Sequence, residues 1–424
     1  MLRLLYSLVF YLAQPLIWLR LLLRARKQPE YLQHLGERYG FYTQAVPDQL
    51  LWLHVVSVGE TRAAEPLIKA LLAEYPEHSL LLTHMTPTGR ATGGDLIARY
   101  GPRLIQAYLP YDLPGASARF LDHFRPCLGL LMETELWPNL IAAAKRRRIP
   151  LALVNARLSL RSQRGYLKLY EMIAPALQSL YAVAAQTPAD AQRLSEVGAD
   201  QVRVFGNLKF DVTPAAEKLQ LGIQWRQALG SRPVWLAAST REGEEALILD
   251  AFVQFARPDT LLLLVPRHPQ RFSAVAELVA QRQLSCCRRS AGAFPEKSTR
   301  VWLGDSMGEM PAYFATADLA LMGGTLLPFG GQNLIEGAAC GCPVLVGPHT
   351  FNFTQATLDA IACGAARRVA DAGEAARETE WLLADPKALQ AMHAAALEFS
   401  QAHRGATERT VALVREIMGP GKAG

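Results

Sequence analysis

The sequence contains no residue pattern that would hold a metal ion. Its six cysteines form no Cys-x-x-Cys pair and no Cys/His spacing of metal ligands, and no Asp-x-Asp pair follows a predicted strand. A Walker-type phosphate loop and short internal repeats are also missing, which excludes P-loop nucleotide hydrolases and solenoid proteins. No cysteine receives a role, and thiols without a disulfide framework favour a reducing compartment. We therefore expect no metal and no other cofactor.

Charged residues are also scarce, at 19% of the 424 residues, whereas hydrophobic residues make up 50%. This composition excludes a disordered chain, and the length suits two domains better than one core. The net charge of +6 is gathered in clusters. The first cluster comprises Arg3, Arg20, Arg24, Arg26 and Lys27, and the second is the Lys-Arg-Arg-Arg run at 145–148. Such clusters favour anionic lipid or phosphate, although the second also suits a solvated helix end. Neither is interleaved with aromatic residues, so we expect no nucleic-acid partner.

The first 27 residues are typical of a membrane anchor with a basic flank. Residues 4–19 are almost all apolar, and residues 21–23 extend this run toward the roughly 20 residues that a membrane span needs. A secretory signal peptide is disfavoured because no small-residue cleavage site follows, while a helix buried in the protein stays an alternative. The segment could span the bilayer or lie in its interface. Because the basic residues follow the apolar run, we expect the rest of the chain in the cytoplasm.

Short apolar runs alternate with amphipathic helical stretches along the whole chain. The strand-like runs are 51–56, 80–83, 128–132, 151–154, 182–185 and 202–204, then 234–238, 261–265, 301–303, 319–322 and 344–346. This alternation predicts an α/β fold with two doubly wound parallel sheets, each covered by helices on both faces. The polar segment 211–232 lacks a strand-like run and is the predicted linker. The expected domains are therefore an anchor (1–27), a first domain (28–210), a linker (211–232) and a second domain (233–424), with strand ends facing a shared cleft.

Three acidic residues and one lysine in the first half follow predicted strands. Glu60 ends a strand and a tight turn, where a carboxylate is well placed as a general base but could equally favour a helix N-terminus. Glu133 and Glu135 follow the strand at 128–132, and one could bind a hydroxyl or offset a cation. Lys209 could reach across the cleft to a phosphate or be solvated surface.

Three loops of the second half also follow predicted strands. Ser239 and Thr240 can cap the next helix and offer hydroxyls to a phosphate. Arg267 and His268 suit an anion or the edge of a base, although the histidine could also be structural. The turn at 307–309 opens another helix, whose N–H groups could meet a nucleotide.

A glycine-rich stretch lies between a strand and a helix of the second half. Gly323-Gly324-Thr325 follows one predicted strand, and Gly330-Gly331-Gln332-Asn333-Leu334-Ile335-Glu336 leads into the next helix. Such a turn brings bare N–H groups and a helix N-terminus to an anion. Asn333 and Glu336 are three residues apart, on one helix face, and a carboxylate there suits a ribose diol. The stretch indicates a nucleotide-linked substrate, the alternative being a glycine-rich loop without a ligand.

Together these residues resemble the Kdo (3-deoxy-D-manno-octulosonic acid) transferase family of lipopolysaccharide assembly, over essentially the whole chain. The matching segments include Gly36-Glu37-Arg38-Tyr39-Gly40, Ser57-Val58-Gly59-Glu60, Glu133-Thr134-Glu135-Leu136-Trp137-Pro138-Asn139, Leu208-Lys209-Phe210-Asp211, Pro266-Arg267-His268-Pro269 and Gly304-Asp305-Ser306-Met307-Gly308-Glu309. The family has the GT-B architecture, two Rossmann-like domains with the active site between them. Its members transfer Kdo, with inversion, from CMP-Kdo to the tetraacyl disaccharide bisphosphate precursor of lipid A (lipid IVA).

The resemblance implies a role for each of these strand-end residues. Glu60 would be the catalytic base, and Glu133 and Lys209 would stabilise the transition state. The second domain would bind the donor and the first domain the lipid acceptor, at the cytoplasmic face of the inner membrane, with membrane lipids contacting residues 1–27. The residues expected to bind CMP are Ser239, Thr240, Arg267, His268, Met307, Gly308, Glu309, Gly331, Gln332, Asn333, Leu334, Ile335 and Glu336.

The glycine-rich helix start departs from the family pattern, Gly-Gly-His-Asn-Pro-(Leu/Met)-Glu. Gln332 replaces the histidine and loses titration near neutral pH, and Leu334 replaces a proline that would preorganise the first turn. Three rival functions stay open: a GT-B enzyme that uses a UDP-sugar and a lipid acceptor, a UDP-sugar 2-epimerase, and a non-catalytic membrane scaffold. The apolar N-terminus disfavours the epimerase, which is soluble.

Overall fold

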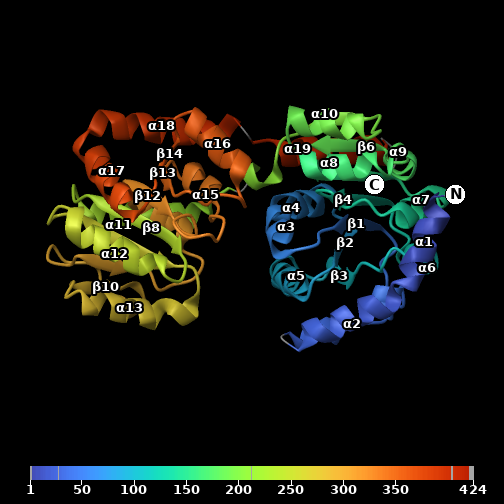
Figure 1. Ribbon diagram of the computed structural model, residues 1–424, viewed down its shortest axis with the longest axis horizontal. Coiled ribbons are helices and arrows are strands. Elements are labelled where there is room, and N and C mark those ends of the chain that lie inside the picture. Colours follow the sequence, from blue (N-terminus) through green and yellow to red (C-terminus); the bar gives the residue numbers. More distant parts are fainter. Residues whose placement is uncertain (1, 27, 212, 403, 420–424) are drawn as a thin grey trace. The chain divides into compact units, whose positions relative to one another are not determined.

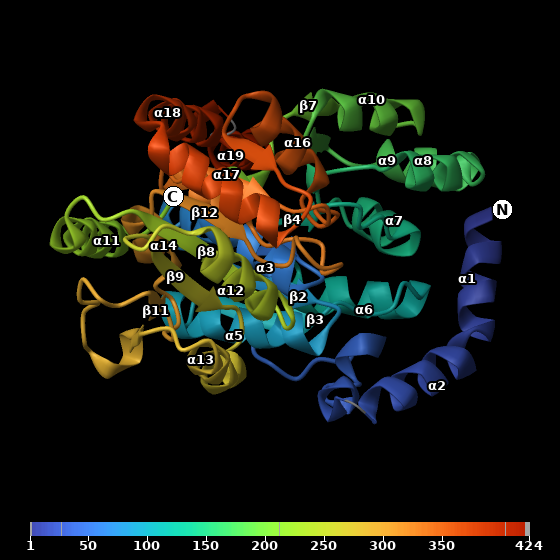
Figure 2. The same cartoon turned by 60° about the vertical axis from the view of Figure 1, so that its left-hand side comes forward.

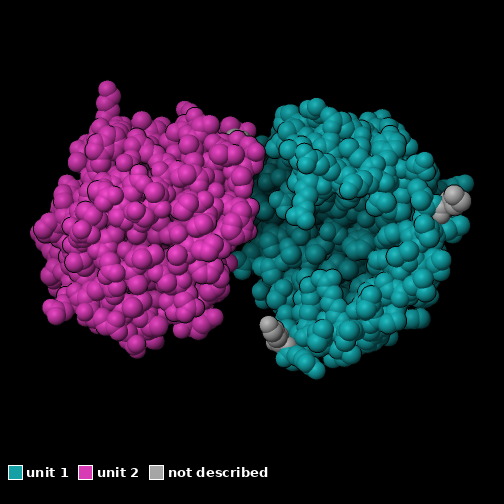
Figure 3. Space-filling view, viewed as in Figure 1, with its two compact units in different colours: residues 1–211, 404–424 teal, residues 212–403 magenta. Residues whose placement is uncertain are grey.

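The computed structural model describes residues 2–26, 28–211, 213–402 and 404–419. The chain divides into two compact units, residues 1–211 with 404–424 and residues 212–403, coloured separately in Figure 3. Parts of the sequence predictions lie outside the described residues: Met1 and Lys27 of the anchor, Val212 of the linker, and residues 403 and 420–424 of the second domain.

The N-terminal unit is built on a parallel sheet of seven strands in the order β3-β2-β1-β4-β5-β6-β7 (Figure 1). The strands are β1 (Leu50–His54), β2 (Ser79–His84), β3 (Leu104–Tyr108), β4 (Leu128–Met132), β5 (Leu151–Ala156), β6 (Ala182–Ala185) and β7 (Val202–Val204). From β1 the chain winds outward to β3, returns to β4 beside β1, and then winds outward to β7. All residues of β1 and β4 are buried because helices cover both faces, which explains their unbroken apolar runs.

The second unit is also doubly wound, with seven parallel strands in the order β10-β11-β9-β8-β12-β13-β14, in which β11 lies between β9 and β10. The strands are β8 (Val234–Thr240), β9 (Leu261–Pro266), β10 (Cys286–Arg288), β11 (Val301–Leu303), β12 (Leu319–Met322), β13 (Val344–Val346) and β14 (Ala366–Arg368). The predicted pair of doubly wound parallel sheets is therefore confirmed. Strands β3, β10 and β14 were not expected, and each is an edge strand with partly exposed residues.

Helices connect successive strands and pack on both faces of each sheet (Figures 1 and 2). In the N-terminal unit they are α3 (Val58–Ala63), α4 (Glu65–Glu74), α5 (Pro87–Tyr100), α6 (Pro114–Phe124), α7 (Pro138–Arg146), α8 (Leu160–Leu167), α9 (Tyr170–Leu177) and α10 (Pro188–Glu196), with 3₁₀ turns η1 (Pro29–Leu32), η2 (Glu37–Tyr39) and η3 (Leu208–Asp211). In the second unit they are α12 (Glu244–Phe255), α13 (Phe272–Gln281), α14 (Met310–Thr316), α15 (Leu334–Ala339), α16 (Thr354–Ala362), α17 (Ala372–Ala384) and α18 (Pro386–Ala402), with η4 (Pro269–Arg271) and η5 (Arg289–Ala291).

The predicted linker 211–232 is largely a helix of the second unit. Helix α11 (Ala216–Leu229) packs against α14. Gly222 permits a close approach, because a Cβ there would lie 2.4 Å from the Ala312 carbonyl oxygen. Trp225 is buried beside Trp302, with ring centroids 5.1 Å apart. Because the outer face of α11 is polar, the sequence did not predict this packing.

The predicted second domain, 233–424, also extends too far. Helix α19 (Ala406–Met418) belongs to the N-terminal unit, where it packs on α4. Its buried Val411 and Val414 join the core of that unit, and the Asp211 carboxylate accepts the Gly405 N–H at 2.6 Å. Apolar residues at the spacing i, i+3 and i+7 (Val411, Val414 and Met418) predict that one face of α19 is buried. They do not predict on which unit the helix packs.

The N-terminus forms two helices, α1 (Leu2–Leu12) and α2 (Gln14–Ala25), that meet at 49°. Among the described residues no single helix is long and apolar enough to cross a membrane, although this bent pair meets that test jointly by length and composition. One side of the pair packs on the N-terminal unit: Asn139 donates to Ser7 Oγ at 3.0 Å, Tyr39 donates to Gln14 Oε1 at 2.9 Å, and Leu21 is buried. The other side exposes a row of large apolar residues that includes Leu4, Leu5, Leu8, Leu12, Leu16 and Leu19.

Candidate active site

The winding of the N-terminal sheet reverses between β1 and β4, so their carboxyl ends flank a topological switch point. Ligands of doubly wound sheets bind at such points, because the connecting loops diverge there and leave a crevice. Glu60 follows β1 and Glu133 follows β4 directly. Both predicted catalytic carboxylates therefore lie at this edge of the sheet.

Glu60 lies in the first turn of α3, where its backbone N–H donates to the capping Ser57 Oγ. Its carboxylate accepts the Val56 N–H at 2.9 Å on Oε2 and the Ser57 hydroxyl at 2.8 Å on Oε1. Glu60 is therefore an acidic residue in the first turn of α3, as its alternative role at a helix N-terminus requires, while Ser57 is the cap. Burial nevertheless raises the pKa of Glu60 above its ordinary 4.5, an effect to which the nearby charge of Glu133 adds. A held carboxylate with a raised pKa is a stronger base.

Glu133 adopts a left-handed backbone conformation (φ 58°) immediately after β4. Its N–H donates to the Val154 carbonyl at 3.0 Å, which extends the pairing with β5 by one residue. Arg157 Nε donates to Glu133 Oε2 at 3.1 Å. Non-glycine residues in this conformation are uncommon and gather at functional sites. Glu135, its neighbour in the sequence, instead lies 3.8 Å from the buried His54 Nε2.

Lys209 lies on η3, which a side-chain network holds against the end of β5. Asn155, also left-handed (φ 52°), accepts the Leu208 N–H on its side-chain oxygen at 3.0 Å. Burial lowers the pKa of Lys209 below 10.5, while the charges of Glu133 and Glu60 act in the opposite direction. The lysine is therefore electrostatically coupled to both carboxylates. The structure brings the three predicted catalytic residues into one group, and it adds Arg157 and Asn155, to which the sequence analysis gave no role.

In the second unit, the equivalent reversal lies between β8 and β12, and the predicted donor residues lie at the carboxyl ends of the strands around it or in the loops that follow. Ser239 is left-handed (φ 57°) at an irregularity in the pairing of β8 with β9. Gly323, after β12, lies against it so closely that a Cβ would fall 2.3 Å from the Ser239 carbonyl oxygen. Thr240 donates its hydroxyl to Glu245 at 3.1 Å.

The fully buried carboxylate of Glu244 fixes the glycine-rich stretch by accepting hydrogen bonds from its backbone. One carboxylate oxygen accepts the N–H groups of Gly324 (2.6 Å) and Arg241 (2.9 Å), and the other accepts those of Leu326 (3.0 Å) and Leu327 (3.4 Å). A buried carboxylate is tolerated when hydrogen bonds satisfy it in this way. Glu244 is thus a positioning residue that the sequence analysis did not single out.

The bare N–H groups expected in this stretch are partly engaged within the loop. Gly331 donates to the Gly324 carbonyl at 2.7 Å and Gln332 to the Gly323 carbonyl at 3.0 Å, while the Gly324 N–H is taken by Glu244. These three groups cannot form the expected anion cradle as they stand. The glycines therefore allow two loop segments, 323–324 and 331–332, to pair closely through their backbones.

The remaining predicted donor residues follow the strand ends. Asn333 caps α15 by accepting the Ile335 N–H at 3.2 Å, and its amide donates to Glu336 at 3.2 Å. Burial, followed by the charges of Arg241 and Arg267, lowers the pKa of His268 below 6.5, which favours a neutral imidazole beside two guanidinium groups. Leu334 is buried in the first turn of α15. Met307 and Gly308 lie in the turn before α14, where Met307 is exposed and Gly308 has a positive φ of 75°. Glu309 accepts both Arg289 Nε and a terminal guanidinium nitrogen at 3.1 Å.

Replacing Glu244 with Gln is expected to loosen the glycine-rich loop. One acceptor oxygen becomes an N–H donor that faces two other donors, and each unsatisfied buried N–H costs about 1–3 kcal/mol. Amide hydrogen exchange in the peptide that covers Gly324–Leu327 should then accelerate by about 30-fold for a loss of about 2 kcal/mol. Glu242→Gln is the matched control, since that neighbouring side chain is 80% exposed. Equal exchange in the two variants would contradict the role of Glu244.

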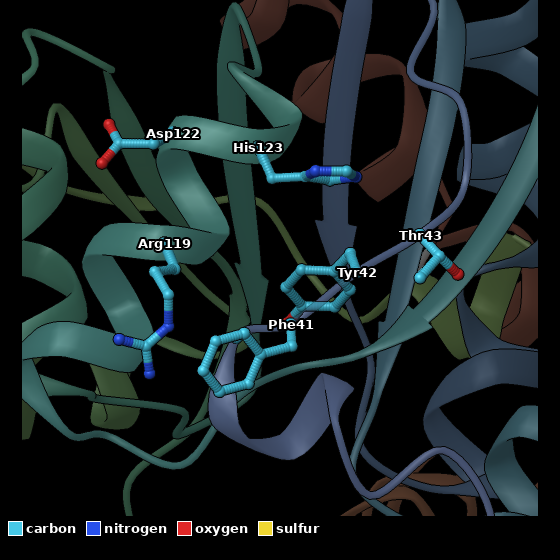
Figure 4. A pocket seen from close by; sticks show the side chains of 7 residues that line it. Phe41, Tyr42, Thr43, Arg119, Asp122 and His123 are labelled. Carbon is cyan, nitrogen blue, oxygen red and sulfur yellow. The ribbon is translucent and has the colours of Figure 1, made fainter.

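The N-terminal unit also contains a cavity of about 540 Å³ that includes none of the predicted site residues. It is lined by Gly40, Phe41, Tyr42, Thr43, Arg119, Asp122 and His123, from the loop before β1 and from α6 (Figure 4). The Arg119 guanidinium stacks over Phe41 at 4.4 Å, and His123 stacks on Tyr42 at 5.5 Å. These pairings tie the loop to α6.

In the described part of the chain, no three His, Cys, Asp or Glu side chains are grouped as ligands for a metal ion. The chemistry available at the two strand edges is that of carboxylates, a lysine, guanidinium groups and backbone N–H donors. Such groups suit proton abstraction by a carboxylate next to a cation that stabilises developing negative charge.

Comparison with known proteins gives consistent matches. Residues 33–212 match the family model described as 3-deoxy-D-manno-octulosonic-acid transferase (kdotransferase). The 3-deoxy-D-manno-octulosonic acid transferase of Bordetella pertussis is 46% identical over 428 residues, which is 98% of this chain and 99% of the relative. The enzyme of the same name from Haemophilus influenzae is 37% identical over 431 residues, with the same shares of 98% and 99%.

Solved structures show a similar fold at low identity. A glycosyltransferase from Rickettsia africae superposes with a TM-score of 0.57 at 14% identity, over 88% of this chain and all of that one (100%). UDP-GlcNAc 2-epimerase from Neisseria meningitidis gives 0.55 at 15% identity, over 87% and 100%. These similarities establish the fold alone and do not separate a transferase from an epimerase.

Proposed function

The chain belongs to the 3-deoxy-D-manno-octulosonic acid transferase family, whose members are glycosyltransferases, and we propose that it moves Kdo from CMP-Kdo to the lipid A precursor lipid IVA. The observation that carries this proposal is the grouping of Glu60, Glu133 and Lys209 at one strand edge, in a chain similar to named Kdo transferases over nearly its full length.

In this mechanism Glu60 takes the proton of the acceptor hydroxyl as that oxygen attacks the anomeric carbon of Kdo. CMP leaves from the opposite face, which inverts the configuration, through a transition state that resembles an oxocarbenium ion. Val56 and Ser57 hold the carboxylate of Glu60 in place through its two hydrogen bonds, so no reorientation is needed. Lys209 and Glu133 stabilise the transition state through their charges, the lysine next to the negative charge that develops and the carboxylate next to the positive charge.

The second unit would bind CMP at the carboxyl edge of its sheet. The guanidinium of Arg267 and the imidazole of His268 suit the nucleotide phosphate and base, and the carboxylate of Glu336 suits the ribose diol. Because the N–H groups of Gly331 and Gln332 are engaged within the loop, the side chain of Gln332 becomes the group at that position that can meet the donor.

The α1–α2 pair would attach the enzyme to the cytoplasmic face of the inner membrane. Its packed side is fixed to the N-terminal unit at Ser7, Gln14 and Leu21, so the exposed leucines form an outer apolar face. An amphipathic pair of this kind suits a position in the plane of the interface.

The released nucleotide tests the proposal. Purified protein with CMP-Kdo and lipid IVA should release CMP in step with a mass gain of Kdo on the lipid, whereas UDP-sugars should yield no UDP. Reactions without acceptor correct for spontaneous donor hydrolysis. Release of UDP from a UDP-sugar would favour a rival that uses UDP-sugars. CMP release that lipid IVA does not stimulate would indicate hydrolysis of the donor and would contradict transfer to this acceptor.

A further inference from the structure

Helix α8 and the turn after it form an exposed surface that is both apolar and basic. Leu160, Leu167, Leu169 and Tyr170 are 62%, 45%, 48% and 45% exposed. Three exposed cations lie among them, Arg161, Arg164 and Lys168. We call residues 160–170 the α8 surface. So many large apolar side chains on a short exposed segment mark an interaction site.

Few residues of α8 contact the rest of the unit, so most of the helix surface is exposed and can contact a partner. Gln163 is buried and donates to Glu196, and the Tyr166 hydroxyl donates to the Thr134 carbonyl at 3.3 Å. Within the described ranges, none of Arg161, Arg164 and Lys168 forms an ion pair. The spacing i, i+3 and i+7 places these three cations along one flank of the helix.

The α8 surface lies next to two features already described. Ser159, its capping residue, is two positions after Arg157, which binds Glu133. Helix α9, which follows α8, packs against α1 (Figures 1 and 2). The surface is therefore connected to the strand edge that carries Glu133 through residues 157–159, and to α1 through α9.

We propose that the α8 surface binds the anionic headgroups of a lipid bilayer, with the three cations on lipid phosphates and Leu160 and Leu167 in the interface. The single sign of charge argues for an anionic partner, and the mixture with large apolar groups matches helices that lie on anionic membranes. The exposed apolar face of α1, a helix that contacts the same α9 as α8 does, argues for a bilayer as that partner. Binding there holds the edge of the sheet that carries Glu133 at the lipid surface.

The test uses the full chain and vesicles of phosphatidylcholine, alone or with added phosphatidylglycerol, and no sugar nucleotide, so its outcome does not depend on the proposed reaction. The variant is Arg161→Gln/Arg164→Gln/Lys168→Gln. The matched control, Lys69→Gln/Lys297→Gln/Lys387→Gln, removes three other exposed cations. The α8 variant should partition onto the anionic vesicles about 10–100-fold more weakly than the control, because each cation near such a surface strengthens partition by about fivefold at most. Partition onto neutral vesicles should change little.

Two results would overturn the proposal. Equal partition of the variant and the control onto anionic vesicles would show that the cations do not meet lipid, as expected if a protein covers the surface. An equal loss on neutral and anionic vesicles would show that headgroup charge is not recognised. Leu160→Ser/Leu167→Ser provides an independent check, since it keeps the charges and should weaken binding to both kinds of vesicle.

Discussion

Glu60→Gln is expected to slow Kdo transfer by about 10²–10⁴-fold, because the amide has nearly the same shape but cannot take the acceptor proton. The amide oxygen can still accept the Val56 N–H, so α3 and its cap should persist. Binding of CMP, measured by calorimetry, should be unchanged, since the predicted donor residues lie in the other unit. Glu77→Gln, an exposed carboxylate of the same unit, is the control for the loss of one negative charge. Near-normal turnover by Glu60→Gln would remove this residue from the role of base.

The pH profile gives a second measurement on the same residue. The base must be ionised, so kcat/KM should fall as the pH drops through the pKa of Glu60, which burial and the charge of Glu133 place above 4.5. In Glu133→Gln the repulsion is absent, the pKa falls, and the acidic limb of the residual activity should move to lower pH. An acidic limb that does not move would show that another group titrates.

Lys209→Met is expected to lower kcat by about 10²–10³-fold, the usual loss when one preorganised charge donor is removed from a site. The methionine keeps the length and apolar stem of the lysine, so η3 should stay docked through Asn155 and Leu208. In the wild-type enzyme the ammonium must keep its proton, and burial lowers its pKa below 10.5, so activity should fall at alkaline pH as the proton is lost.

Lys209→Arg and Lys69→Gln serve as the comparison for this loss. The arginine keeps the charge and should recover part of the rate, while Lys69 is an exposed lysine of α4 whose removal should leave kcat unchanged. If Lys209→Met and Lys69→Gln behave alike, the lysine is structural and the charge on the leaving CMP is stabilised elsewhere.

The central strands could be predicted from the sequence because burial on both faces requires unbroken apolar runs. Every strand expected from such a run is present. The edge strands β3, β10 and β14 lack an unbroken apolar run, since they contain Gln106, Arg288 and Arg367, whereas the edge strand β7 was predicted from Val202 and Val204. The predicted linker is wrong for a related reason: α11 has a polar outer face, so its sequence shows neither a strand-like run nor a clear apolar helix face.

The candidate site could be predicted where a residue lies in the turn or first helical turn that follows a strand. Glu60, in the first turn of the helix after β1, and Glu133, directly after β4, carry that signal. Asn155, Arg157 and Glu244 act through contacts with loops far away in the sequence, and such contacts leave no local pattern. Left-handed conformations at Glu133, Asn155 and Ser239 are likewise imposed by the tertiary structure, since none of these residue types requires a positive φ.

Helix α19 determines the order in which the two units can fold during synthesis. The second unit, residues 212–403, leaves the ribosome entirely before α19 does, so it can close its core first. The N-terminal unit must wait with the α4 surface uncovered, because Val411 and Val414 complete that core only later. Vectorial synthesis usually lets the N-terminal domain fold first. Here the N-terminal unit is the one whose core is completed last, so we expect the half of the nascent chain that carries Glu60 and Glu133 to expose apolar surface for longer.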